Sequence, residues 1–182
     1  MSSSLTHLID LAKEPSSAKR RELLREVTGI FMARPDEVTG PEMALYDTVM
    51  TQLSTDMETV VRAEISQTIA SARNAPLGLL RKLAVDDIEV AEPILTRSKA
   101  LSESDLMHVV STKGQDHMRA VSKRDSVPEA VSGVIVQRGD DTTLHALLSN
   151  EGARLSRASN EQVVHRAQSN PAQRGRALRY IQ

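Results

Sequence analysis

The segment LLRKLAVDDIEVAEPILTRSKALSESDLMHVVS, residues 79–111, is followed by a segment of similar pattern, MRAVSKRDSVPEAVSGVIVQRGDDTTLHALLS, residues 118–149. A shift of 41 residues places identical or similar residues on one another: Val90 on Val131, Ile94 on Ile135, Leu95 on Val136, Arg97 on Arg138, Leu106 on Leu147 and Met107 on Leu148. A period near forty residues is typical of stacked HEAT or armadillo units, which bury their apolar faces against their neighbours. The segment therefore predicts a helical-repeat architecture.

The composition favours packed helices over sheets. The 182 residues include one Phe, two Tyr and no Trp, so the core is expected to consist of Leu, Val, Ile, Met and Ala. The sequence contains no Cys, which excludes disulfides, thiolate metal sites and a thiol nucleophile. No apolar run approaches the roughly 18 residues of a membrane span, and no secretory signal pattern is found. We therefore expect an all-α cytoplasmic protein.

Apolar spacing, capping residues and prolines predict helices along the whole chain. The first four are expected over residues 5–12, from Ser17 to the region before Pro35, from Pro41 to Leu53, and from Asp56, after a capping box of Thr55 and Glu58. Shorter helices are expected over 77–85, 88–98, 103–112, 116–123, 128–137, 142–149, 160–169 and 172–180. The expected N-caps are Asp87, Ser102 and Asp141, and the expected left-handed C-caps are Gly114, Gly139 and Gly152.

These elements predict two regions. Residues 1–74 are expected to form an N-terminal helical bundle. Residues 75–182 are expected to continue it as a HEAT/armadillo-like α-solenoid of about two repeats and a partial third, with three helices per repeat. We expect both regions to pack together as one unit.

Residues spread between Val61 and Ala153 resemble those of a known family. They include Ala75-Pro76, Leu83-Ala84, Asp86, Val90-Ala91, Pro93-Ile94-Leu95, Ser98, Leu101, Asp105-Leu106, His117, Ala120-Val121, Arg124, Val127, Val131, Val136, Arg138-Gly139-Asp140, Asn150 and Ala153. Together they are similar to a bacterial family of uncharacterised HEAT-like proteins, domain of unknown function 2336. The resemblance implies the helical-repeat fold, and it implies no activity, cofactor or catalytic residue. Members of that family are often longer, so this chain is either a short member or the front part of a larger protein.

A basic cluster supplies the candidate binding residues, which are Arg97, Arg119, Lys123, Arg124 and Arg138. Because Arg97 and Arg138 occupy equivalent positions, a stack would align them toward carboxylates or phosphates. A purely structural alternative stays open. In that case the arginines cap helix C-termini and form internal ion pairs with Asp105, Asp125 or Asp140.

Other kinds of site receive little support from the sequence. No Gly-rich phosphate loop, G-x-S-x-G or H-E-x-x-H motif is present, so we predict no enzyme activity and no catalytic residue. Asp140, Asp141 and His145 are more plausibly helix-capping and surface residues than metal ligands, and we expect no metal or cofactor. His117, between an acid and a base, resembles a phosphoacceptor histidine only weakly.

The best functional hypothesis is a non-enzymatic scaffold or adaptor that binds another protein through its repeat surface, in bacterial signalling. The alternative is a sensor in which Arg124 and Arg138 clamp a phosphorylated ligand such as a cyclic dinucleotide. The last 31 residues carry six Arg against Glu161 alone, roughly +5. With an acidic remainder, nucleic-acid binding is disfavoured. Self-association through the C-terminal end is a further expectation.

Overall fold

The computed structural model describes Lys13 and residues 16–169, and this part of the chain is helical throughout, without a β-strand. The predicted all-α class is therefore confirmed. The helices expected over 5–12 and 172–180, and the C-terminal end expected to self-associate, lie outside the described residues. Within the described helices, none combines the length and the apolar character needed to cross a lipid bilayer.

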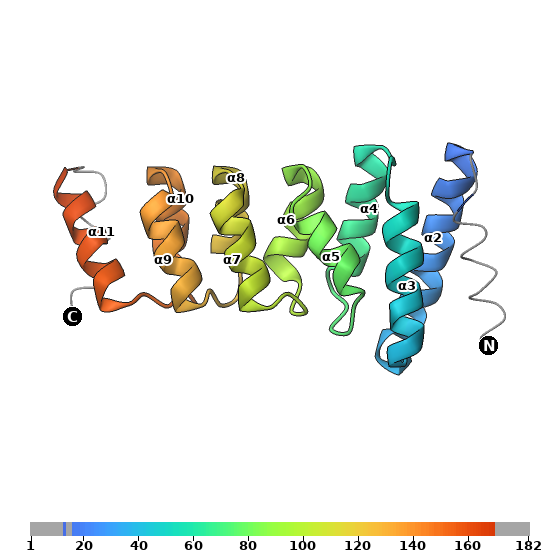
Figure 1. Ribbon diagram of the computed structural model, residues 1–182. Helices are drawn as coiled ribbons and strands as arrows, with labels where there is room; N and C mark the ends of the chain where they lie inside the picture. Colours follow the sequence, from blue (N-terminus) through green and yellow to red (C-terminus); the bar gives the residue numbers. More distant parts are fainter. Residues whose placement is uncertain (1–12, 14–15, 170–182) are drawn as a thin grey trace. The chain divides into compact units, whose positions relative to one another are not determined.

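The chain divides into two compact units, residues 1–101 and residues 102–182. The predicted division after residue 74 depends on where the repeats begin, and it stays a prediction. In unit 1, the helices are α2 (Ser17–Ala33), α3 (Gly40–Leu53), α4 (Thr59–Ile69), α5 (Leu77–Ala84) and α6 (Ile88–Arg97), with a short 3-10 turn, Pro35–Glu37, between α2 and α3 (Figure 1).

Helices two steps apart in the chain pack against each other in unit 1. Helix α2 contacts α4 and α4 contacts α6, while α3 contacts α5. Apolar side chains with no solvent exposure fill the space between them, among them Leu24, Phe31, Met50, Leu53, Ile69, Leu79, Leu80, Leu83, Ile94 and Leu95. The only aromatic contact among the described residues joins Phe31 to Tyr46, edge to face at 5.3 Å between ring centroids. The aliphatic core that the composition predicts is thus present in unit 1.

Unit 2 contains α7 (Glu103–Thr112), α8 (Gln115–Ser122), α9 (Glu129–Arg138), α10 (Asp141–Leu148) and α11 (Arg157–Ser169). The same alternation holds here, because α7 contacts α9, α8 contacts α10, and α9 contacts α11 (Figure 1). The helical pair α7–α8 is followed by the pair α9–α10, and each first or second helix recurs after 26 residues. The recurring element in unit 2 is therefore a pair of helices, whereas the sequence suggested three helices per repeat.

Local signals explain where most helices begin. Ser102 is the N-cap of α7 and forms a capping box with Asp105, as its position in the sequence predicts. Helix α10 starts one residue earlier than expected, because Asp140 rather than Asp141 is its N-cap and accepts a hydrogen bond from the Thr143 backbone. Asp87 occupies the N-cap position of α6 but makes no side-chain capping bond there.

Two predicted capping features are wrong. The capping box expected at Thr55 and Glu58 does not form, because Asp56 adopts a left-handed backbone with φ of 58° and α4 starts only at Thr59. A capping box does form earlier, between Thr39 and Glu42.

The expected left-handed glycine C-caps are also wrong, since no described glycine has a positive φ. Gly139 and Gly152 are needed for close approach instead. A Cβ at Gly139 would lie 2.6 Å from the Ile135 carbonyl oxygen, and one at Gly152 would lie 1.9 Å from the Asp125 carbonyl oxygen.

Candidate binding site

Arg97 and Arg138, which the sequence pairs as equivalent, end α6 and α9 and play the same structural role. In unit 1, Arg97 donates a hydrogen bond of 3.1 Å to the carbonyl oxygen of Gln67 on α4. In unit 2, Arg138 donates to the carbonyl oxygen of Val110 on α7. In both cases a guanidinium satisfies a carbonyl near the C-terminal end of the helix against which its own helix packs, where a cation is favoured by the helix dipole.

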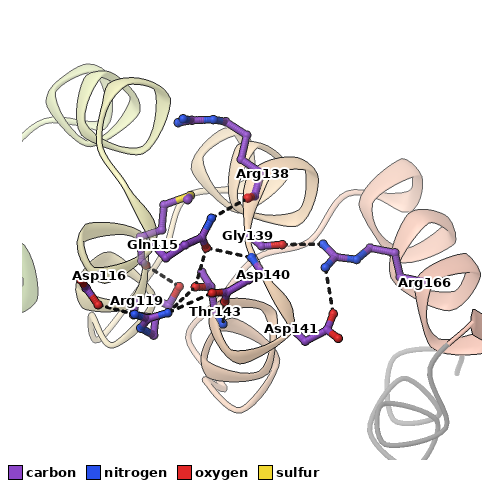
Figure 2. Close-up of polar contacts among 11 residues, drawn as sticks. Gln115, Asp116, Arg119, Arg138, Gly139, Asp140, Asp141, Thr143 and Arg166 are labelled. Atoms are coloured by element: carbon purple, nitrogen blue, oxygen red, sulfur yellow. Dashed lines mark hydrogen bonds and ion pairs between the residues drawn. The ribbon is translucent and has the colours of Figure 1, made fainter.

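A third arginine repeats this contact. Arg166 on α11 donates two hydrogen bonds of 2.9 Å, to the carbonyl oxygens of Val136 and Gly139, and a third of 3.2 Å to the Asp141 carboxylate (Figure 2). The sequence reasoning missed Arg166 as a member of this set. The available signal was its neighbourhood, because Arg166 lies three residues after buried Val163, as Arg97 lies after Ile94 and Arg138 after Ile135.

The loop Arg138-Gly139-Asp140, between α9 and α10, is fixed from α8 by Gln115. The Gln115 side-chain amide donates at 3.0 Å to the Arg138 carbonyl oxygen, and its own oxygen accepts from the Asp140 backbone at 2.8 Å and the Thr143 hydroxyl at 2.9 Å (Figure 2). All the hydrogen-bonding capacity that these contacts use lies inside unit 2. The most specific part of the family resemblance is therefore a structural junction between helices.

Arg119, another predicted site residue, belongs to the same junction. Its guanidinium pairs with the Asp116 carboxylate one turn away, with Asp140 at 3.3 Å, and with the Thr143 hydroxyl at 3.3 Å. Hydrogen bonds from the Thr143 backbone and hydroxyl, and then the charge of Arg119, hold the pKa of Asp140 below its ordinary value. Of the internal ion pairs that the structural alternative named, the one to Asp140 is present.

Lys123 and Arg124 lie at the C-terminal end of α8 and just beyond it. Lys123 is exposed, and Arg124 is partly buried, which lowers the pKa of its guanidinium through desolvation. The backbone at this point is fixed by Asn150, whose side-chain amide donates to the carbonyl oxygens of Ser122 at 2.8 Å and Arg124 at 2.7 Å. Asn150 thus closes the end of α8 as Gln115 closes the end of α9.

The predicted site residues do not form a single described cluster. Arg97 belongs to unit 1 and the other four belong to unit 2. Within unit 2, the Arg138 guanidinium extends away from Arg119 and the loop junction (Figure 2). Arg97, Arg119 and Arg138 each donate to acceptors within the chain, which is the arrangement expected of helix-closing contacts. In the described residues, no group of three His, Asp or Glu side chains is placed to hold a metal ion.

Comparison with known proteins gives one match. Residues 90–179 match the sequence model of a family described as an uncharacterised protein conserved in bacteria (DUF2336). This is the family whose motifs the sequence resembles, although the matched stretch begins after Val61 and continues beyond Ala153 into α11. It contains α9, the Arg138-Gly139-Asp140 junction and Arg166. No curated protein and no solved structure matches the chain.

Proposed function

We propose that this chain is a non-enzymatic scaffold or adaptor that binds another protein through the surface of HEAT-like helical repeats. The proposal includes a cytoplasmic location and a role in bacterial signalling. Its main support is the use made of the candidate cations. Arg97, Arg119 and Arg138 are occupied by internal carbonyls and carboxylates, so they close helices rather than waiting for an anionic ligand.

The packing of unit 2 adds a second support. Two helical pairs follow each other at a fixed interval, and every first helix contacts the next first helix. Such an arrangement repeats the same surface along its length and can thereby offer an extended contact area to a partner. The step from helical repeat to protein binding is an analogy with other repeat proteins.

The alternative, a sensor for a phosphorylated ligand, requires Arg124 and Arg138 to converge on one anion. Arg138 instead donates to the Val110 carbonyl oxygen, and desolvation already disfavours the charged form of Arg124. A phosphate clamp would need both guanidinium groups to be available and close together. The adaptor is therefore the better hypothesis.

Affinity capture with the full chain, from a lysate of the native host, tests this proposal. We expect a specific protein that also binds the purified chain in a direct titration. In parallel, a panel of cyclic dinucleotides and nucleoside phosphates is expected to leave the Tm of the chain unchanged. A nucleotide that raises the Tm by several degrees, together with no captured protein, would replace the adaptor with the sensor.

A further inference from the structure

Helix α11 packs on α9 with smaller side chains than its counterparts use. In α6, the two buried residues that precede the arginine are Val90 and Ile94, and in α9 they are Val131 and Ile135. In α11 the corresponding residues are smaller: Ser159 and Val163. Since apolar burial scales with the area removed from water, α11 gains less from docking than α6 or α9 does.

Polar groups in this region add to the cost of the docked state. The Ser132 hydroxyl of α9 and the side-chain oxygen of Asn160 on α11 are buried without a hydrogen-bond partner among the described residues. A buried polar atom without a partner forfeits the hydrogen bonds it makes in water. The contact of α9 with α11 is consequently less well satisfied than an ordinary helix interface.

Most of the described polar attachment of α11 to the rest of unit 2 comes from Arg166. Its guanidinium meets three acceptors, which are the carbonyl oxygens of Val136 and Gly139 and the carboxylate of Asp141. If α11 leaves, these acceptors remain as a negatively polarised site at the end of α9. A helix that replaces α11 must therefore carry a cation at the same position.

The chain segment before α11 is anchored independently of it. Val127 donates to the Gly152 carbonyl oxygen at 3.0 Å, and the Arg154 backbone donates to Val127 at 3.0 Å. Helix α11 starts three residues after Arg154, at Arg157. It can therefore separate from α9 while the loop from α10 stays in place.

We infer that the face of α9 beneath α11 is an interaction surface that a partner's amphipathic helix occupies by displacing α11. This helix carries Val and Ile where α11 has Ser159 and Val163, and an Arg where α11 has Arg166, which is the pattern that α6 and α9 already use. The inference rests on the proposed adaptor function and names the surface and the class of partner.

A labelled peptide tests the surface directly. The probe is residues 157–169 with Ser159→Val and Val163→Ile, and its binding to the full chain is measured by fluorescence anisotropy. The chain variant Arg166→Gln, which weakens its own α11, is expected to bind the probe about tenfold more tightly than wild type, because a larger fraction of the chain is open. A probe that additionally carries Arg166→Gln is the matched control and is expected to bind at least about tenfold more weakly, since it lacks the cation that the three acceptors require.

A disulfide lock supplies a second test on an intact fold. A Cβ at Gly133 would lie 3.6 Å from the Ser159 hydroxyl oxygen, so the double variant Gly133→Cys/Ser159→Cys is placed to form a bond between α9 and α11. The natural chain has no Cys, so no other pairing competes. The oxidised form is expected to lose probe binding, and reduction is expected to restore it.

Equal binding of the probe to the oxidised and reduced forms would overturn the inference, as would equal affinity for wild type and the Arg166→Gln chain. Such a result would leave the adaptor proposal standing, because a partner can bind another face of the repeats. Failure of the adaptor proposal has a different signature, namely no captured protein with the unlocked chain.

Discussion

Arg166 donates a hydrogen bond of 2.9 Å to the carbonyl oxygen of Val136, on the helix that packs beneath its own. The same contact joins Arg138 to Val110, and Arg97 to Gln67 in the other unit. An arginine that the sequence offered as a ligand-binding group thus works three times as a helix-closing group. This recurrence leads to the first prediction.

Replacing Arg166 with Gln is expected to loosen α11 locally and to cost about 1–3 kcal/mol of docking free energy, because partly buried charge-assisted hydrogen bonds are lost. Amide hydrogen exchange should accelerate over residues 157–169 and remain unchanged in α8. Arg157→Gln is the control, because the Arg157 side chain is 94% exposed and pairs only with Glu161 in the same helix. Equal protection of α11 in both variants would argue against the role given to Arg166.

Glycines in two settings should respond to alanine with opposite signs. Gly139→Ala places a Cβ 2.6 Å from the Ile135 carbonyl oxygen and is expected to destabilise the chain by about 1–3 kcal/mol. Gly29→Ala, on α2, meets no atom within 4 Å and is expected to stabilise by about 0.5–1 kcal/mol, through the higher helix propensity of alanine. Urea unfolding measures both, and a stabilising Gly139→Ala would contradict the close approach in the loop.

Two buried serines should also behave oppositely. The Ser132 hydroxyl is buried without a hydrogen-bond partner in the described part of the chain, so Ser132→Ala is expected to stabilise by about 1 kcal/mol. The Ser66 hydroxyl donates to the Val90 carbonyl oxygen and ties α4 to α6, so Ser66→Ala should destabilise by about 1 kcal/mol. The thermal midpoint of each variant gives the sign. Loss of stability in Ser132→Ala would indicate that its hydroxyl has a partner.

Asp140 gives the junction a defined pH dependence. Its pKa is lower in the folded protein because of hydrogen bonds from Thr143 and then the charge of Arg119. A depressed pKa contributes stability that is present above the ordinary aspartate pKa, about 3.9, and is lost as the pH falls through the lower folded value. The free energy of unfolding should therefore fall less steeply with acidification in Asp140→Asn than in wild type, and superimposable slopes below pH about 4 would refute this.

The sequence predicted the helices well because their signals are local. The expected helix 103–112 matches α7 at both ends, and most others from residue 77 onward differ by about one residue, since capping residues and apolar spacing act within one or two turns. The start of α4 failed for a related reason. Asp56 takes a left-handed backbone that no pattern at Thr55 and Glu58 reveals.

The repeat length was less accessible because it depends on packing between distant residues. A shift of 41 residues correctly aligned α6 with α9 and Arg97 with Arg138, since both helices bury Val and Ile before a terminal arginine. Unit 2 nevertheless recurs after 26 residues, and the corresponding helix α11 has Ser159 and Val163 in place of Val and Ile, which hid the third member. The destination of each guanidinium was equally invisible, because its acceptors are backbone carbonyls that carry no sequence signature.

The most direct test of the account is affinity capture from a lysate of the native host with the Gly133→Cys/Ser159→Cys chain, in reduced and oxidised forms. The account predicts a specific partner protein on the reduced chain that is absent from the oxidised chain. The same partner on both forms would contradict the α9 surface alone. No specific partner on either form, with wild type equally empty, would contradict the adaptor function itself.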